Sequence, residues 1–74
     1  MYKVITNVGC KRGLKAKKIL DLKDVSFTYI IQQDLKTDDW ERYAEKARKA
    51  DNKDFPIILN CEGESVSLES LEDL

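Results

Sequence analysis

The 74-residue chain has no histidine and only two cysteines, Cys10 and Cys61. A zinc site built without histidine from two cysteines would need unusual help from carboxylates, so we expect no metal. Two cysteines are also too few for a small fold held together by disulfides. The sequence shows neither a signal peptide nor a long apolar run. These absences predict a soluble, cytoplasmic protein with reduced thiols and no membrane partner.

The length predicts one domain, residues 1–74, with a small hydrophobic core. The net charge of −1 conceals an asymmetry, because residues 1–23 carry seven basic side chains against one acid and residues 62–74 carry five acids and no base. The basic segment is either a solvated helix face or a local field that draws anionic substrates. Since the whole chain is slightly acidic and shows no basic face with interleaved aromatic residues, we expect no nucleic-acid partner.

The periodicity of apolar residues predicts the element order β-α-β-α-β-β-α. Val25, Phe27 and Tyr29 alternate as in a strand, whereas Ala16, Ile19 and Leu20 recur at helical spacing. The predicted strands are residues 2–6, 25–31, 57–60 and 65–68, and the predicted helices are residues 12–22, 37–49 and 69–74.

The helix at 37–49 has the clearest boundaries. Thr37 is a good N-cap, and Asp38 and Asp39 follow in the first turn, where acids favour the helix dipole. Trp40 and Tyr43 lie at helical spacing, and we interpret them as core residues rather than as a ligand-binding pair.

The element order also predicts a topology. Both β-α-β steps would give parallel strand pairs with right-handed crossovers, and the last two strands would pair antiparallel. The result is an α/β fold, a four-stranded mixed sheet with helices on both faces.

Cys10 stands where the first strand passes into the first helix. Backbone N–H groups and the helix dipole at such a junction favour an anion, which lowers the pKa of a thiol. Lys11, Arg12 and Lys15 add positive charge nearby. The arrangement predicts a nucleophilic thiolate, and the alternative is a small buried cysteine without chemistry.

Two segments resemble the glutaredoxins, a family with a minimal thioredoxin fold. Residues 10–20, Cys-Lys-Arg-Gly-Leu-Lys-Ala-Lys-Lys-Ile-Leu, are similar to the family's Cys-x-x-Cys-x-x-Ala-Lys-x-x-Leu, with Gly13 in place of the second cysteine. Residues 55–58, Phe-Pro-Ile-Ile, resemble the segment in which a cis-proline faces the active thiol. The resemblance covers nearly the whole chain and depends on the order and spacing of the two segments.

The resemblance implies a monothiol glutaredoxin-like protein that exchanges thiols with glutathione mixed disulfides. Cys10 would be the nucleophile, and Lys11, Arg12 and the helical turn at Gly13 would stabilise its thiolate. Pro56 would be cis, so that the Phe55 backbone pairs with an extended substrate. Glutathione would be the co-substrate, the partner would be glutathione or a cysteine-containing protein, and the chain would act as a monomer.

Several departures from the family pattern keep a second hypothesis open. Gly13 removes the resolving thiol, and Cys61 lies about 16 Å along an extended strand from Pro56, too far to replace it easily. Ser67 and Leu68 stand about where the family has Gly-Gly, and no lysine closely precedes Cys10. Cys-Lys-Arg-Gly also differs from the Cys-Gly-Phe-Ser of cluster-binding members. The alternative is therefore a thioredoxin-fold binding module that has lost redox turnover.

Overall fold

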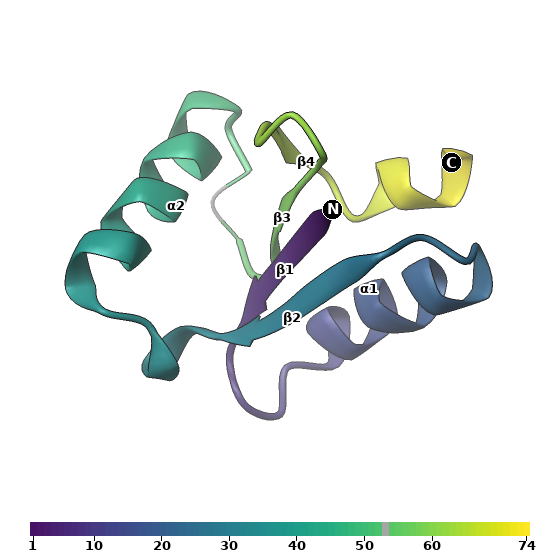
Figure 1. Ribbon diagram of the computed structural model, residues 1–74, viewed down its shortest axis with the longest axis horizontal. Helices are drawn as coiled ribbons and strands as arrows, with labels where there is room; N and C mark the ends of the chain where they lie inside the picture. Colours follow the sequence, from purple (N-terminus) through teal and green to yellow (C-terminus); the bar gives the residue numbers. More distant parts are fainter. Residues whose placement is uncertain (53) are drawn as a thin grey trace.

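The computed structural model describes residues 1–52 and 54–74, and its elements follow the predicted order (Figure 1). The C-terminal helix is a 3₁₀ helix rather than an α-helix. The elements are β1 (Tyr2–Thr6), α1 (Lys11–Leu22), β2 (Phe27–Ile31), the 3₁₀ turn η1 (Gln32–Asp34), α2 (Thr37–Lys49), β3 (Ile57–Leu59), β4 (Ser65–Val66) and the 3₁₀ helix η2 (Glu69–Asp73).

The four strands form one mixed sheet in the order β2-β1-β3-β4. β1 pairs parallel with β2, and β3 pairs antiparallel with both β1 and β4. The predicted antiparallel pairing of the last two strands is confirmed, but the predicted parallel pairing in the second β-α-β step is wrong. Ile57, the first residue of β3, pairs with Ile5 near the end of β1, so β3 starts where β1 ends and runs the opposite way.

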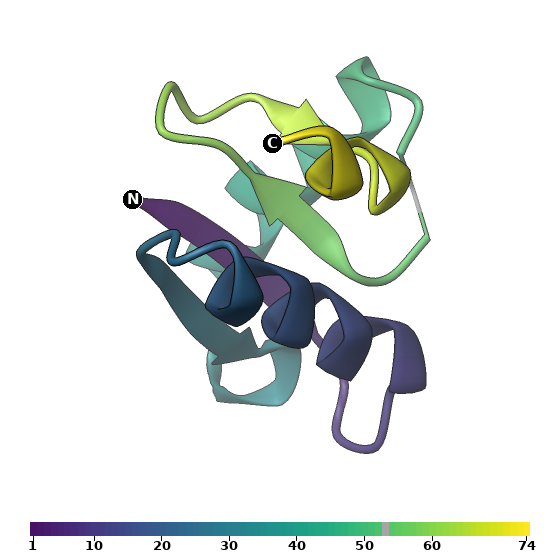
Figure 2. The ribbon, with the colours of Figure 1, turned by 90° about the vertical axis from the view of Figure 1, so that its right-hand side faces the viewer.

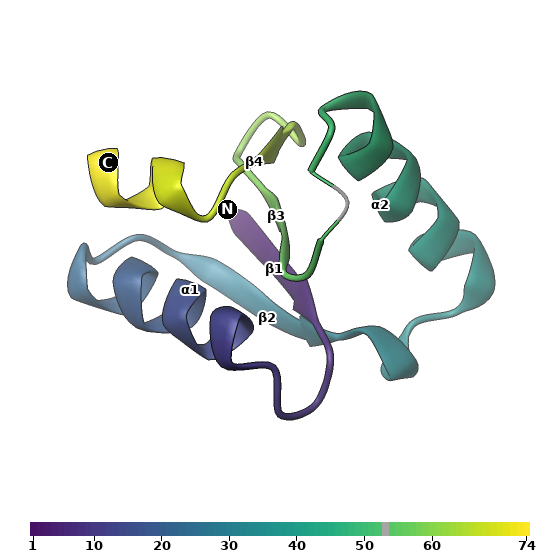
Figure 3. The same cartoon turned by 180° about the vertical axis from the view of Figure 1, so that it is seen from behind.

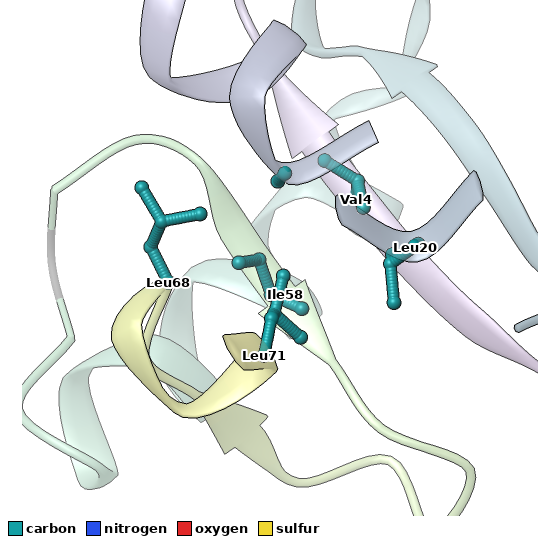
Figure 4. Packing of buried hydrophobic residues seen from close by; sticks show 6 residues of the cluster. Val4, Leu20, Ile58, Leu68 and Leu71 are labelled. Atoms are coloured by element: carbon teal, nitrogen blue, oxygen red, sulfur yellow. The ribbon is translucent and has the colours of Figure 1, made fainter. Parts of the chain in front are cut away.

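The sheet is covered on both faces, as predicted, by different helices (Figure 1). Side chains of successive strand residues point to opposite faces. Val4 and Ile58 accordingly join the core under α1 and η2, whereas Ile5 and Ile57 join the core under α2. Figure 4 shows the first of these clusters, in which Val4, Ile58, Leu20 of α1, and Leu68 and Leu71 of the C-terminal segment gather. From behind, η2 lies beside α1 and away from α2 (Figure 3).

Helix ends explain why the second strand starts later than predicted. The chain leaves α1 through Asp24, whose φ is 59°, and the Val25 N–H donates to the Leu20 carbonyl at 3.0 Å. This is a Schellman-type C-terminus, in which Val25 still satisfies a helix carbonyl and is not free to join the sheet. β2 therefore begins at Phe27.

The predicted cap of α2 is also wrong in detail. Lys36 is the N-cap residue and Thr37 is already helical, and no side chain caps the helix. Asp38 and Asp39 do lie in the first turn. Trp40 and Tyr43 pack against the α2-side core as expected, and the Trp40 ring stacks on Phe55 with centroids 5.6 Å apart.

The hairpin between β3 and β4 turns at Gly63, whose φ of +80° suits glycine. The Asn60 side-chain carbonyl accepts the N–H groups of Glu62 and Glu64 at 3.0 and 2.9 Å and so holds the turn. β4 then extends for only two residues, shorter than predicted, because Ser67 and Leu68 already lead into η2. Across residues 1–52 and 54–74, no helix has the length and apolar character needed to cross a membrane.

Candidate thiol site at the start of the first helix

Cys10 is the N-cap residue of α1. A short loop joins β1 to α1 (Figure 2). The backbone of Cys10 is extended, with φ −72° and ψ 113°, and Gly9 before it has a φ of +77°. The Cys10 N–H donates to the Asn7 carbonyl at 3.2 Å, and the Cys10 carbonyl accepts the Leu14 N–H at 3.2 Å. The residue is half-buried. The thiol thus lies at the positive end of a helix, within reach of solvent.

The surroundings of Cys10 lower the pKa of its thiol. The Thr6 hydroxyl lowers the pKa most and the Gly13 backbone N–H comes next, because both groups can donate a hydrogen bond to the thiolate. Partial burial acts in the opposite direction and raises the pKa, and the Arg12 backbone N–H and charge lower it again. Lys11 is exposed and is not among the causes. The helix N-terminus and one buried hydroxyl therefore act together on the sulfur.

Thr6 is a residue of the candidate site that the sequence interpretation did not include. It is the last residue of β1 and is fully buried. Strand alternation places Thr6 on the same face as Val4, beneath α1, and this periodicity is the signal that could have identified it. Thr6 therefore places a hydroxyl, rather than an apolar group, beneath the start of the helix that Cys10 precedes.

The Thr6 hydroxyl has no hydrogen-bond partner of ordinary geometry among the residues that the structure describes. Its effect on Cys10 nevertheless dominates the lowering of the thiol's pKa. The two observations are compatible, because a neutral thiol is a weak acceptor whereas a thiolate attracts a nearby O–H group strongly.

Gly13 is buried in the first turns of α1 and lies directly against Thr6. A Cβ atom at position 13 would lie 2.8 Å from both Cβ and Cγ2 of Thr6, and closer still to Oγ1. Carbon atoms do not approach so closely without displacement of the backbone. The absence of a side chain at position 13 therefore allows α1 to settle on the end of β1.

A shallow groove next to the first turn of α1 brings several predicted site residues together. Its volume is about 100 Å³, well below the roughly 300–1,000 Å³ of enclosed ligand pockets. The groove is lined by Arg12, Asp51, Asn52, Asp54, Pro56, Val66, Ser67, Leu68 and Glu69. Cys10 itself does not line it. The groove is an anchoring place for an extended molecule rather than an enclosing pocket.

Phe55 and Pro56 occupy different surroundings. The Phe55–Pro56 peptide bond is cis, as the resemblance implies. Pro56 lines the groove, whereas the Phe55 ring packs on the opposite side of the sheet against Trp40. Only the backbone of Phe55 is thus available toward the Pro56 side. Ser67 also lines the groove, and its Oγ accepts the Ser70 N–H at 3.2 Å.

Cys61 is separate from this site. It is exposed after β3, and both cysteines are free. Among residues 1–52 and 54–74, no group of three or more cysteine, aspartate or glutamate side chains is arranged so that it could hold a metal ion.

No family model, no curated protein and no solved structure matches the chain. The chemistry of the residues around Cys10 is therefore the guide to function. A half-buried thiol with a lowered pKa at a helix N-terminus is suited to act as a nucleophile.

Site-resolved alkylation provides a first prediction. We expect the reaction of Cys10 with iodoacetamide to reach half of its maximal rate at a lower pH than that of a free thiol, about 8.5. The sign follows from the lowered pKa, since thiolate forms at a lower pH and only thiolate reacts. Mass spectrometry of each cysteine across pH 5–10 measures this. Equal profiles for Cys10 and the exposed Cys61 would contradict it.

Proposed function

We propose that the protein is a glutaredoxin-like member of the thioredoxin-fold proteins and exchanges thiols with glutathione mixed disulfides through Cys10 alone. The observation that carries the proposal is the position of Cys10 as the N-cap of α1, with its pKa lowered by Thr6, Gly13 and Arg12. The element order, with a cysteine before α1 and a proline before β3, supports the assignment to this fold.

The reaction has two exchange steps. In the first, the Cys10 thiolate attacks the glutathione sulfur of a mixed disulfide, so that a new disulfide forms and the substrate leaves as a thiolate, which takes a proton from water. In the second, a glutathione thiolate attacks the glutathione sulfur of the Cys10 adduct. This releases glutathione disulfide and regenerates the Cys10 thiolate. Overall, one mixed disulfide and one free glutathione become the substrate thiol and glutathione disulfide, and no second protein thiol takes part.

The groove beside α1 suits an extended thiol substrate. Pro56 leads directly into β3, whose first residue, Ile57, has no partner on β4, so a peptide that lies along the groove there can pair with backbone groups rather than with deep side-chain pockets. Arg12 lines the same groove, is exposed and can bind a substrate carboxylate. Asp51, Asp54 and Glu69 also line the groove and offer partners for a substrate amine.

Trapping of the intermediate tests the proposal. The reduced protein is mixed with a glutathionylated peptide, quenched with acid and mapped by mass spectrometry, with the Cys61→Ser variant as the matched control. We expect a glutathione adduct on Cys10 that forms within the assay in both proteins and disappears when free glutathione is added. An adduct on neither cysteine, or on Cys61 alone, would overturn the proposal and favour a binding module without turnover.

A further inference from the structure

The buried Thr6 hydroxyl lies against Gly13, in the first turn of α1 after Cys10, and neither exchange step uses it. Thr6 Oγ1 is the one buried side-chain oxygen or nitrogen without a hydrogen-bond partner among residues 1–52 and 54–74. An unpaired buried hydroxyl is costly, because it loses its hydrogen bonds to water. A polar group in such a position calls for an explanation.

We propose that Thr6 is a positioning residue for Cys10. The Thr6 hydroxyl donates a hydrogen bond to the Cys10 sulfur whenever that sulfur is anionic. The bond to the thiolate does not depend on turnover, whereas its role in exchange rests on the proposed function. The hydroxyl finds no adequate partner when Cys10 is a neutral thiol and finds one when Cys10 is ionised. The Thr6 hydroxyl thus has a hydrogen-bond partner only when Cys10 is a thiolate, which is its reactive state.

The location of Thr6 makes this donor rigid. Thr6 ends β1 and is in register with Ile31 in the parallel ladder with β2, so its backbone is fixed by the sheet. Its branched Cβ restricts rotation of the side chain. The buried backbone of Gly13 closes the space above it. A donor held in this way loses little freedom when the thiolate forms, which is the advantage of preorganisation.

Gly13 and Thr6 together also explain the use of a single thiol. A side chain at position 13 would enter the volume that Thr6 occupies, so the place next to Cys10 holds a hydroxyl instead of a second sulfur. A hydroxyl cannot form a disulfide, but it can stabilise the Cys10 sulfur in both exchange steps. In the first step that sulfur is the attacking thiolate, and in the second it is the leaving thiolate.

Three variants separate the hydroxyl from the shape of Thr6. Thr6→Val keeps the branched shape and removes the hydroxyl, and Thr6→Ser keeps the hydroxyl and removes the methyl group. Thr28→Val makes the same change at an exposed position of β2 and is the matched control. The readout is the pH profile of Cys10 alkylation, with Cys61 as the internal standard and circular dichroism to verify the fold.

We expect Thr6→Val to shift the Cys10 profile to higher pH and to lower its alkylation rate at pH 7 about tenfold, in line with the loss of a hydrogen bond to a charged group. Thr6→Ser and Thr28→Val should keep the wild-type profile. Should Thr6→Val not fold, Thr6→Ala, which also lacks the hydroxyl, gives the same comparison against Thr6→Ser.

An unchanged profile in Thr6→Val would overturn the inference, and so would an equal shift in Thr6→Ser, since shape would then be the cause. The outcome is independent of the proposed function, because alkylation needs no glutathione. A shifted profile in a protein that never forms the glutathione adduct would retain the role of Thr6 and remove the exchange reaction. Normal exchange in the wild type, together with an unshifted alkylation profile in Thr6→Val, would retain the exchange reaction and remove the role of Thr6.

Discussion

Gly13→Ala is expected to destabilise the protein by about 1–3 kcal/mol, the usual cost of forcing extra atoms into a packed interior. In an ordinary helix interior, the same change stabilises by up to about 1 kcal/mol, because alanine has the higher helix propensity. The sign reverses here because the new Cβ would lie 2.8 Å from Cβ and Cγ2 of Thr6. Urea denaturation of the wild type and the variant measures the difference.

Two further variants make this prediction specific. Lys15→Ala changes an exposed position in the same helix and should alter the free energy of unfolding by less than about 0.5 kcal/mol. In a Thr6→Ala background, where Oγ1 and Cγ2 are gone, Gly13→Ala should cost less than it does in the wild type. A stabilised Gly13→Ala protein, or equal costs in both backgrounds, would show that α1 and β1 are not in the close contact described here.

The same contact bears on the missing second thiol. Gly13→Cys would place a larger side chain in the volume that Thr6 occupies, so the Cys-x-x-Cys motif is not restored by this single change. The helix would have to move away from β1 before the two sulfurs could pair. The close packing of α1 on β1 therefore leaves no space for a cysteine side chain at position 13, and a second change would be needed to make that space.

Local sequence patterns were sufficient to predict the order of elements. Apolar alternation and helical spacing are properties of a few consecutive residues, and they located β1, α1, β2, α2 and β3. The start of β2 and the end of β4 differed from the prediction for reasons that lie outside such windows. Val25 caps a helix carbonyl instead of joining β2, and the chain after Val66 turns into η2 instead of extending β4.

Strand direction could not be derived in the same way. The position of β3 beside β1 depends on which edge of β1 remains free after β2 has paired and on where the chain leaves α2. Neither is encoded in the residues of β3, since Ile57, Ile58 and Leu59 are all buried and show no alternation. A strand that is apolar on both faces fits a parallel or an antiparallel neighbour equally well.

The site was predictable where its chemistry is local along the chain. Cys10 precedes α1, and Arg12 and Gly13 follow within one turn, so their proximity was evident from sequence. Thr6 acts across the contact between β1 and α1, and its role depends on how closely the helix approaches the strand. That distance is a tertiary property, fixed by the missing side chain of Gly13. Pro56 and Arg12 likewise meet at one groove only after the fold has formed.

Cys10→Ser is expected to reduce glutathione exchange to the uncatalysed background, because a serine hydroxyl stays protonated at neutral pH and forms no disulfide. Cys61→Ser should leave the rate unchanged, since Cys61 is exposed and does not line the groove that Arg12 and Pro56 line. The measurement is the initial rate of deglutathionylation of a peptide at fixed glutathione concentration. Full activity in Cys10→Ser would contradict the role assigned to this residue.

Stability separates loss of chemistry from loss of fold in that experiment. Cys10 is the N-cap of α1, and its side chain makes no capping hydrogen bond. Serine is among the preferred N-cap residues, because its hydroxyl accepts a backbone N–H of the first turn. Cys10→Ser should therefore have a free energy of unfolding about 0.5–1 kcal/mol larger than that of the wild type, measured by urea denaturation. A variant that is inactive and more stable than the wild type would assign the exchange reaction to the sulfur of Cys10, because loss of the fold could not explain the loss of activity.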